Sequence, residues 1–244
     1  MTVAPRLLKV AAGGSDHNVR IFATDLGQNE KLIVLKHRDY VNSIAFHPMA
    51  EESQVVSGSD DHTIALWNSE NGQRLHTITF DHPIMSVVWH PEEVSKLMIA
   101  EKNGVIHIFN IASYKPILSL HCGMEAPLLT ADWSLCNSLL IIAAVRSEII
   151  VFDSSKMTVV CRKKLPQDII KQVKFSPFSD SIIATAAQPT YNVSVANLKS
   201  QQTVPILTKE PVSAISWFKR GSILVNTTAT FENLSYIFYF CFIF

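Results

Sequence analysis

Aspartate–histidine pairs are the side chains of this sequence whose types could support metal binding or acid–base chemistry. Asp16-His17 and Asp61-His62 each stand in a polar stretch, and Ser57 precedes the second pair. A carboxylate, an imidazole and a hydroxyl together can activate a nucleophile or hold a cation. The two pairs are 45 residues apart, however, and each is followed by a run of alternating apolar residues. This periodicity predicts the same structural turn on two neighbouring repeats, and not one reactive cluster.

Two further histidines lead to the same interpretation. His47 and His90 each stand between an aromatic residue and a proline, at equivalent places 43 residues apart. The sequence also lacks G-x-S-x-G, a phosphate-cradling glycine loop and H-E-x-x-H. We therefore predict that the chain is not an enzyme, and we expect no cofactor, no metal site and no small-molecule substrate.

The composition is that of a globular chain with a large core. Of its 244 residues, 48% are hydrophobic and only 17% are charged, and the formal net charge is zero. A neutral chain lacks the electrostatic signature of a protein that binds nucleic acid or an anionic membrane. The basic cluster Arg162–Lys164 is interpreted as a solvated loop. We expect no direct binding of nucleic acid and no membrane insertion.

The four cysteines are Cys122, Cys136, Cys161 and Cys241. They are widely spaced and include no C-x-x-C pair, so neither a disulfide framework nor a zinc site fits them. The first residues, Met1–Leu7, lack the apolar core of a signal peptide. Reduced thiols in a cytosolic or nuclear protein are expected.

The stretch Val55–Asn68 predicts a β-hairpin. A β-branched run reaches a polar turn at Ser59–His62, and a second run alternates between apolar and polar residues up to Trp67. Weaker versions of the second half occur at 16–22 and 103–110. The chain is therefore predicted to be an array of repeats.

Two independent series of residues give the period of these repeats. The first series closes the first strand of each repeat, and its members are 42 to 44 residues apart: Phe46, Trp89, Trp133, Phe175 and Trp217. The second series closes the third strand, and its members are 42 to 45 residues apart: Phe22, Trp67, Phe109, Phe152 and Ala196. A period of about 40–45 residues is that of a WD-repeat propeller blade of four short antiparallel strands.

We predict an all-β fold of the WD40 β-propeller type over residues 1–230, with about five blades. The chain is expected to open inside a blade, with residues 7–13 as its second strand. It is expected to stop after two strands of a last blade, residues 213–217 and 223–228. The aromatic residues of both series are predicted to fill the cores between blades.

The last segment, residues 231–244, does not follow the repeat. It is rich in phenylalanine and is too short to cross a bilayer as a helix, which needs about 20 apolar residues. We predict a separate apolar tail, which would favour aggregation if it were exposed.

The repeats resemble WD repeats throughout residues 7–228. In WD repeats a histidine, a serine or threonine, an aspartate and a tryptophan commonly form a hydrogen-bonded tetrad. The resemblance implies a structural tetrad of His37, Ser57, Asp61 and Trp67. This repeat alone retains all four residue types.

A closer resemblance lies in residues 55–120, above all in Met85–Glu93 and Lys96–Gly104 with their His-Pro-Glu-Glu and Ala-Glu-Lys-Asn-Gly sequences. These segments are similar to the small WD-repeat nucleoporins of the Y-shaped scaffold complex of the nuclear pore. The resemblance implies a seven-bladed propeller. Compared with that family, we expect the N-terminal blade or more to be missing here and the final strand to be replaced by the tail. It also implies a non-catalytic scaffold subunit at the nuclear envelope. Its partners would be a large nucleoporin with a helical solenoid and other subunits of the Y-shaped complex, and its role would be to support nucleocytoplasmic transport and pore assembly.

Two alternatives remain open from the residues alone. A WD-repeat adaptor of a chromatin or ubiquitin-ligase complex would grip a peptide on the propeller face through acidic or arginine-lined rings, and none stands out in the sequence. A catalytic or metal-binding propeller would need a non-periodic cluster of reactive side chains, which the sequence does not show.

Overall fold

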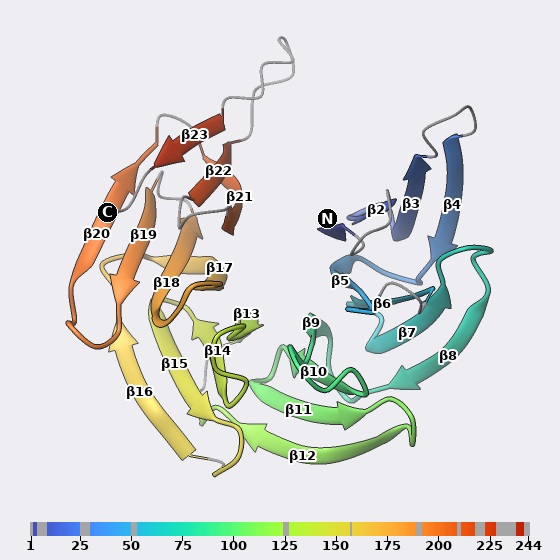
Figure 1. Cartoon of the computed structure of the whole chain (residues 1–244), viewed down its shortest axis with the longest axis horizontal. Helices are drawn as coiled ribbons and strands as arrows, with labels where there is room; N and C mark the ends of the chain where they lie inside the picture. Colours follow the sequence, from blue (N-terminus) through green and yellow to red (C-terminus); the bar gives the residue numbers. More distant parts are fainter. Residues whose placement is uncertain are drawn as a thin grey trace. The chain divides into compact units, whose positions relative to one another are not determined.

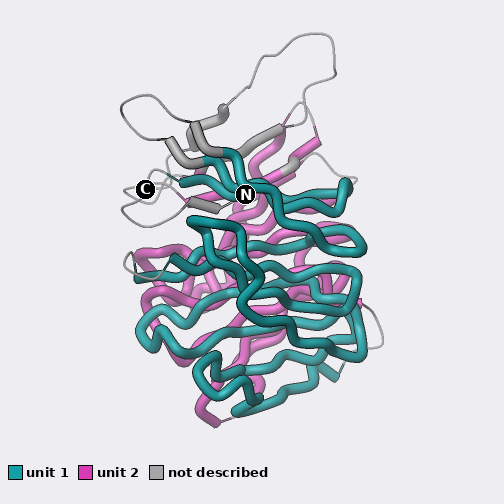
Figure 2. The backbone as a smooth tube through the Cα atoms, turned by 90° about the vertical axis from the view of Figure 1, so that its right-hand side faces the viewer, with its two compact units in different colours: residues 1–123 teal, residues 124–244 magenta. Residues whose placement is uncertain are grey.

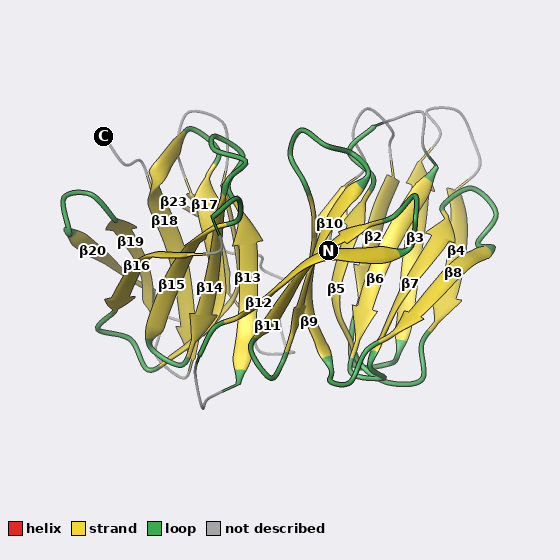
Figure 3. Ribbon diagram, turned by 90° about the horizontal axis from the view of Figure 1, so that it is seen from below, coloured by secondary structure: helices red, strands yellow, loops and turns green. Residues whose placement is uncertain are grey.

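The computed structural model describes ten segments of the chain: residues 2–3, 9–24, 30–49, 53–123, 127–156, 158–188, 192–208, 211–217, 223–227 and 238–241. In these segments all regular structure is β, and the strands are joined by turns and loops without a helix (Figure 3). The strands form six antiparallel sheets, five with four strands and one with three. The predicted all-β fold of WD40 type is confirmed.

The chain divides into two compact units, Met1–Gly123 and Met124–Phe244 (Figure 2). Each unit contains three sheets, and in each sheet the strands lie side by side in chain order (Figure 1). Such up-and-down sheets follow from short connections between antiparallel strands.

Unit 1 holds the first twelve strands. They are β1 (Thr2–Val3), β2 (Lys9–Gly13), β3 (Asn18–Thr24), β4 (Glu30–Lys36), β5 (Val41–Phe46), β6 (Gln54–Ser59), β7 (Thr63–Asn68), β8 (Arg74–Thr79), β9 (Ile84–Trp89), β10 (Lys96–Glu101), β11 (Val105–Asn110) and β12 (Lys115–His121). The predicted hairpin is the β6–β7 pair, with Val55 opposite Trp67.

Unit 2 holds the other eleven strands. They are β13 (Leu128–Trp133), β14 (Leu140–Val145), β15 (Glu148–Asp153), β16 (Thr158–Lys164), β17 (Ile169–Ser176), β18 (Ser179–Gln188), β19 (Asn192–Asn197), β20 (Thr203–Leu207), β21 (Val212–Trp217), β22 (Ile223–Thr227) and β23 (Phe238–Cys241). The basic cluster Arg162–Lys164 belongs to β16 and is therefore part of a strand, not the loop that the sequence predicted.

Both ends of the strand order differ from the sequence prediction. The short strand β1 pairs with β2, so β2 has a first strand beside it. At the other end β23, which comes from the predicted tail, pairs with β22 and makes a third strand. Aromatic and β-branched residues can add to an unpaired strand edge without any repeat signature, which is why the periodicity did not show this strand. The rest of the predicted tail, residues 231–237 and 242–244, lies outside the described residues.

The sheets of unit 1 pack face to face. One cluster joins the β1–β4 sheet to the β5–β8 sheet and contains Ala11, Val19, Ile21, Leu35, Val41, Phe46, Val55, Ala65 and Trp67. A second joins the β5–β8 sheet to the β9–β12 sheet and contains Val56, Ile64, Leu66, Ile84, Val87, Trp89, Leu97, Ile99 and Phe109. The approach is close at Gly58, because a Cβ atom there would lie 2.6 Å from Cγ2 of Ile84.

Unit 2 is built in the same way. Ile142, Ile149, Val173 and Phe175 belong to the cluster between its first two sheets. Val193, Ile215 and Ile223 belong to the cluster between the second and third sheets, against which the half-buried Trp217 packs. Trp133 and Phe152 of the predicted aromatic set are also buried.

Phe22 departs from the predicted core set, because its side chain is 45% exposed. The equivalent aromatics Trp67 and Phe109 each pack against the sheet that precedes theirs in unit 1. Phe22 lies in β3 of the first sheet, which no earlier sheet of its unit covers. Val19 and Ile21 point to the other face of the strand and are fully buried there.

The turn between the second and third strands of a sheet requires one residue in the left-handed region. His17, His62, Gly104 and Arg146 hold this place in four successive sheets, with φ between 52° and 91°. The histidines of the two Asp-His pairs are therefore turn residues of separate sheets, as the periodicity predicted.

Candidate functional site

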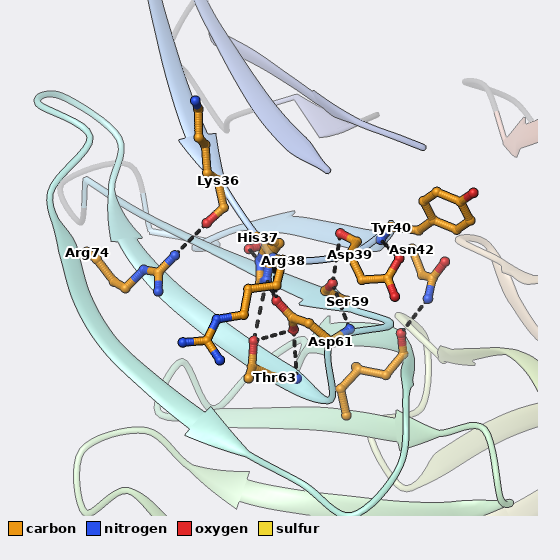
Figure 4. Close-up of polar contacts among 12 residues, drawn as sticks. Lys36, His37, Arg38, Asp39, Tyr40, Asn42, Ser59, Asp61, Thr63 and Arg74 are labelled. Carbon is orange, nitrogen blue, oxygen red and sulfur yellow. Dashed lines mark hydrogen bonds and ion pairs between the residues drawn. The ribbon is translucent and has the colours of Figure 1, made fainter. Parts of the chain in front are cut away.

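A buried polar network ties the loop before β5 to the β6–β7 hairpin, and it contains the four residues of the predicted tetrad. His37 Nδ1 lies 2.9 Å from Asp61 Oδ2, and His37 Nε2 lies 2.7 Å from Ser57 Oγ. Trp67 Nε1 donates to the same Ser57 oxygen at 2.8 Å. Figure 4 shows His37, Asp61 and Thr63 converging at the turn.

The direction of each hydrogen bond follows from the partners. The Asp61 carboxylate can only accept, so Nδ1 of a neutral His37 carries the proton and Nε2 accepts. Ser57 then donates to His37 and accepts from the Trp67 indole. These hydrogen bonds run in series from Trp67 through Ser57 and His37 to Asp61, and none of these side chains is without a partner.

The Asp61 carboxylate receives further donors from both sides of the turn. Its Oδ2 accepts from the Arg38 N–H at 2.9 Å, and its Oδ1 accepts from the Thr63 N–H at 3.0 Å and the Thr63 hydroxyl at 2.6 Å. Burial by itself would raise the pKa of Asp61, but the hydrogen bonds from Thr63, Arg38 and His37 outweigh it and lower this pKa to about 2. Asp61 is therefore ionised at neutral pH.

His37 is held in its neutral form. Burial lowers the pKa of its imidazole, and the opposing effect of Asp61 does not compensate. Arg74 also contacts this network. Its guanidinium lies 4.3 Å from the centroid of a Trp67 ring and donates a hydrogen bond to the Lys36 carbonyl.

Ser57, His37 and Asp61 have the order of a nucleophile, a base and an orienting carboxylate. Ser57 is completely buried, however, and its oxygen already accepts the indole N–H of Trp67. A substrate carbonyl cannot reach that oxygen without disrupting the sheet. The arrangement is suited to fixing the loop on the hairpin.

His47 and His90 have local structural contacts. The His47 ring packs edge-on against Trp89, with 4.6 Å between the ring centroids, and its Nδ1 accepts from the Met49 N–H. His90 Nδ1 accepts from the backbone N–H groups of Glu92 and Glu93. These two histidines brace the loops that follow β5 and β9.

The acidic residues of the turns differ in their surroundings. Asp16 is exposed and pairs with Arg20, whose hydrogen bond lowers the pKa of the Asp16 carboxyl. Asp60 accepts one side-chain hydrogen bond, from Asn42 at 2.7 Å. Neither residue joins the network around Asp61.

The sequence reasoning missed a second polar network, in the β9–β12 sheet. The buried Glu101 accepts from His107 Nε2 at 2.6 Å and from the His82 N–H at 2.9 Å. His107 Nδ1 lies 2.7 Å from Ser119 Oγ on the neighbouring strand. A signal was present, because His82 stands 45 residues after His37.

A third network was also missed, in the β17–β20 sheet. Thr185 donates to Gln167 Oε1 at 2.6 Å, and Gln167 Nε2 donates to Asn192 Oδ1 at 3.2 Å. No histidine or tryptophan occurs in it, so a search for the tetrad residues could not find it.

Polar contacts of a repeated kind link the first strands of adjacent sheets. Within unit 1, Ser43 Oγ accepts from the Val87 N–H at 3.0 Å. Within unit 2, Asp132 accepts from the Phe175 N–H at 2.9 Å, and Gln172 accepts from the Ile215 N–H at 2.8 Å. These bonds hold neighbouring sheets in register.

The described segments also bear on other kinds of site. No group of three or more His, Cys, Asp or Glu side chains there could hold a metal ion. No helix long and apolar enough to cross a membrane occurs in the same segments. Three cysteines of these segments form no disulfide: Cys122 is buried, Cys161 is half-buried and Cys136 is exposed.

Comparison with known proteins gives both a repeat family and close relatives. Residues 29–68, which include the tetrad, match the family model "WD domain, G-beta repeat". Nucleoporin Nup37 of Mus musculus is 33% identical over 226 residues, which are 88% of this chain and 67% of the relative. Nucleoporin Nup37 of Homo sapiens is 34% identical over 187 residues, 76% of this chain and 56% of the relative.

A third relative shows similar coverage of this chain. Nucleoporin Nup37 of Drosophila melanogaster is 31% identical over 216 residues, 86% of this chain and 65% of the relative. The matched part of the chain thus spans between 56% and 67% of the length of these relatives. Because the identity covers most of the chain, and because both units consist of WD-type sheets, the chain belongs to the Nup37 family of WD-repeat nucleoporins.

Proposed function

We propose that this protein is a non-catalytic scaffold subunit of the Y-shaped complex of the nuclear pore, where it binds a large nucleoporin that combines a propeller with a helical solenoid. Membership of the Nup37 family assigns it to the nuclear pore complex at the nuclear envelope. The observation that carries the proposal is the 33% identity to a nucleoporin over 226 residues. The choice of partner and of subcomplex is supported by the resemblance of residues 55–120 to the small nucleoporins of that complex.

The polar network in the β5–β8 sheet supports a scaffold role. Its potential nucleophile, Ser57, is buried and hydrogen-bonded, and its carboxylate, Asp61, is saturated with donors. Side chains in that state stabilise the structure and have no hydrogen-bonding group left for a substrate. The relatives, which are nucleoporins, likewise point to a structural protein.

The bonds between sheets support a rigid binding platform. Ser43, Asp132 and Gln172 each fix a backbone N–H of the next sheet in their unit. A surface that is ordered before binding loses little conformational entropy when a partner docks. The zero net charge supports a further part of the proposal, that the protein contacts other proteins and not nucleic acid directly.

The test is affinity purification of the tagged full chain from cells that express it at native level, with quantitative mass spectrometry and imaging of the nuclear rim. We expect stoichiometric recovery of solenoid nucleoporins of the Y-shaped complex and a rim signal. A Trp67→Ala variant, which should be strongly destabilised, serves as the control for specific recovery. Recovery of a ubiquitin-ligase or chromatin scaffold in place of nucleoporins would favour a WD-repeat adaptor and overturn the proposal.

A further inference from the structure

The polar network of the β9–β12 sheet places a serine, a histidine and a carboxylate in series. Ser119 Oγ lies 2.7 Å from His107 Nδ1, and His107 Nε2 lies 2.6 Å from Glu101 Oε1. A nucleophile in contact with a base, which a third group orients, is the arrangement that activates a hydroxyl. The tetrad has the same order, but its serine, Ser57, is completely buried. Ser119 is exposed, so its hydroxyl can meet a reagent from solvent.

The partners of the His107 ring fix the position of its proton. The Glu101 carboxylate accepts, so Nε2 of a neutral His107 carries the proton and Nδ1 accepts from the Ser119 hydroxyl. Glu101 is 4% exposed, and its other oxygen accepts the His82 N–H at 2.9 Å. Phe80 packs against the imidazole, with 5.3 Å between the ring centroids. The ring is therefore held with its basic nitrogen towards Ser119.

The Ser119 oxygen differs from that of Ser57 in its hydrogen bonds. Ser57 donates to His37 and accepts from the Trp67 indole. Among the described residues, His107 alone is hydrogen-bonded to the Ser119 hydroxyl. The lone pairs of Ser119 Oγ are therefore available to form a new bond.

The main chain at Ser119 also faces solvent. β12 is an edge strand, and β11 is the one described strand that pairs with it (Figure 1). The Cys122 N–H donates to the Gly104 carbonyl at 2.9 Å, and from there the register runs without a shift to the pair of His107 and Ser119. Antiparallel pairs are alternately hydrogen-bonded and non-hydrogen-bonded, which makes His107 and Ser119 a non-hydrogen-bonded pair. The Ser119 N–H therefore points away from β11, beside its own hydroxyl, where it can donate to an oxyanion.

We propose that Ser119 is a site of covalent modification by acyl thioesters. Ser119 Oγ attacks the thioester carbonyl while His107 Nδ1 takes the hydroxyl proton, and the Ser119 N–H donates to the oxygen of the tetrahedral intermediate. When the intermediate collapses, the carbon–sulfur bond breaks and His107 gives the proton to the departing sulfur. The products are a Ser119 ester and a free thiol.

The leaving group decides which class of acyl donor reacts. A thiol has a pKa of about 8.5, so a thiolate leaves the tetrahedral intermediate readily, whereas the leaving groups of alkyl esters and amides are strong bases. With one N–H donor for the oxyanion, Ser119 is suited to such an activated donor. The Ser119 ester has an alkoxide as its leaving group and therefore persists. The site is modified without turning over a substrate, which agrees with a non-catalytic scaffold.

The probe is the thioester octanoyl N-acetylcysteamine, mixed with the full chain at neutral pH. Mass spectrometry of the digested protein measures the rate of acylation at each serine. Ser155 is the internal control, because it is exposed and its hydroxyl donates to the Asp153 carboxylate at 2.6 Å in place of an imidazole. We expect Ser119 to be acylated roughly a hundredfold faster than Ser155, which is the lower end of the effect of a positioned general base.

Two histidine variants test the base. His107→Gln should lower the rate at Ser119 roughly a hundredfold. His121→Gln removes an exposed histidine two residues along the same strand, and as the matched control it should leave the rate unchanged. Thermal melting verifies that each variant is folded, and the comparison of Ser119 with Ser155 needs no variant. Ser119 acylated no faster than Ser155, or a folded His107→Gln protein with the wild-type rate, would overturn the proposal.

Nitrogen NMR of the His107 ring tests the positioning role of Glu101. We expect the ring proton on Nε2 in the wild type. A proton on Nδ1 would leave no acceptor for the Ser119 hydroxyl and would contradict the proposal. Failure of these tests leaves the nuclear pore role standing, because purification from cells tests that role separately.

Discussion

Thr185 donates its hydroxyl proton to the side-chain carbonyl of Gln167 at 2.6 Å, inside the β17–β20 sheet. This contact repeats, with other side chains, the bond between Ser57 and His37 in the β5–β8 sheet. Both Thr185 and Gln167 are buried, as are Ser57 and His37. The two sheets therefore keep the same connection between loop and strand although they share none of its residue types.

The register of the sheets establishes the equivalence. Val55 is the cross-strand partner of Trp67, and Ser57 lies two residues after Val55. Ile183 is the partner of Ala196, and Thr185 lies two residues after Ile183. Alanine replaces tryptophan in the second case, so the network there lacks an indole donor and uses Asn192 as a further partner.

Thr185→Val should destabilise the protein by about 1–3 kcal/mol, because it leaves the buried Gln167 carbonyl without its donor while the side-chain volume is unchanged. Thr185→Ser keeps the hydroxyl and should cost less. Urea unfolding of both variants, followed by circular dichroism, measures the difference. Equal stability of Thr185→Val and the wild type would show that this bond contributes nothing.

Asp61→Ala should be more destabilising than Asp60→Ala. The Asp61 carboxylate accepts hydrogen bonds from Arg38, Thr63 and His37, and its loss leaves buried donors unpaired. Asp60 lies outside this network and accepts one side-chain hydrogen bond. We expect a loss of roughly 2 kcal/mol or more for Asp61→Ala and of about 0.5 kcal/mol for Asp60→Ala. Denaturant titration of the pair is the measurement, and equal effects would mean that the turn is held differently.

Trp67 combines a packing role with a hydrogen bond, and two substitutions separate them. Trp67→Ala should cost roughly 3–5 kcal/mol because it opens a cavity between the first two sheets of unit 1. Trp67→Phe keeps most of the volume and removes the donor to Ser57, so about 1 kcal/mol is expected. Trp89→Ala should behave like Trp67→Ala, since Trp89 is buried between the next two sheets. Thermal melting should show a cooperative unfolding transition at a lower temperature than in the wild type. A Trp67→Ala protein of native stability would contradict the core assignment.

Much of the fold could be predicted because sheet packing enforces a period. Four of the described sheets bury an aromatic at the end of their first strand, and residues such as Trp89 and Phe175 therefore recur at nearly equal spacing. The tetrad around His37 was predictable because its four residue types are all retained. In other sheets the corresponding hydrogen bonds are made by a buried carboxylate, Glu101, or by a buried amide, Gln167. Pattern matching on residue identity cannot find such replacements.

The errors of prediction occurred in the first and the last of the described sheets. Phe22 has the spacing of a core aromatic but lies on the first sheet of its unit, so its burial depends on a sheet that the unit does not supply. Strand β23 was missed because pairing to an edge requires only an extended backbone. The boundary of the repeat region at residue 230 stays a prediction.

Acid should weaken the fold in two steps. The pKa of folded His37 lies below its ordinary value, so below neutral pH the unfolded chain takes up a proton that the folded protein does not, and stability falls as the pH drops from about 7 to about 5. His90 acts in the same direction, because burial lowers its pKa as well. The folded pKa of Asp61 is about 2, so its contribution is complete above about pH 4 and is lost as the pH falls towards 2.

Urea midpoints measured across that range should therefore decline on acidification, and His37→Gln should flatten the part of the curve between about pH 7 and 5. The slope that remains in His37→Gln reports His90 and the other histidines. A wild-type stability that rises between neutral pH and about pH 5 would mean that His37 is protonated in the folded protein.

The exposed face of the first sheet should limit solubility. Phe22, Leu32 and Val34 are half-exposed apolar side chains on β3 and β4, where the equivalent face of the next sheet is covered. Contiguous apolar surface of this kind promotes association. The double variant Phe22→Ser, Leu32→Thr should therefore raise the fraction of the chain that elutes as a monomer in size-exclusion chromatography. Its stability should change by less than about 1 kcal/mol, because neither side chain is in the core. Ala11→Ser, on the buried face of the same sheet, is the control and should lower stability without improving solubility. If the wild-type chain already elutes as a compact monomer with a sharp melting transition, that face is covered in solution and the expectation is wrong.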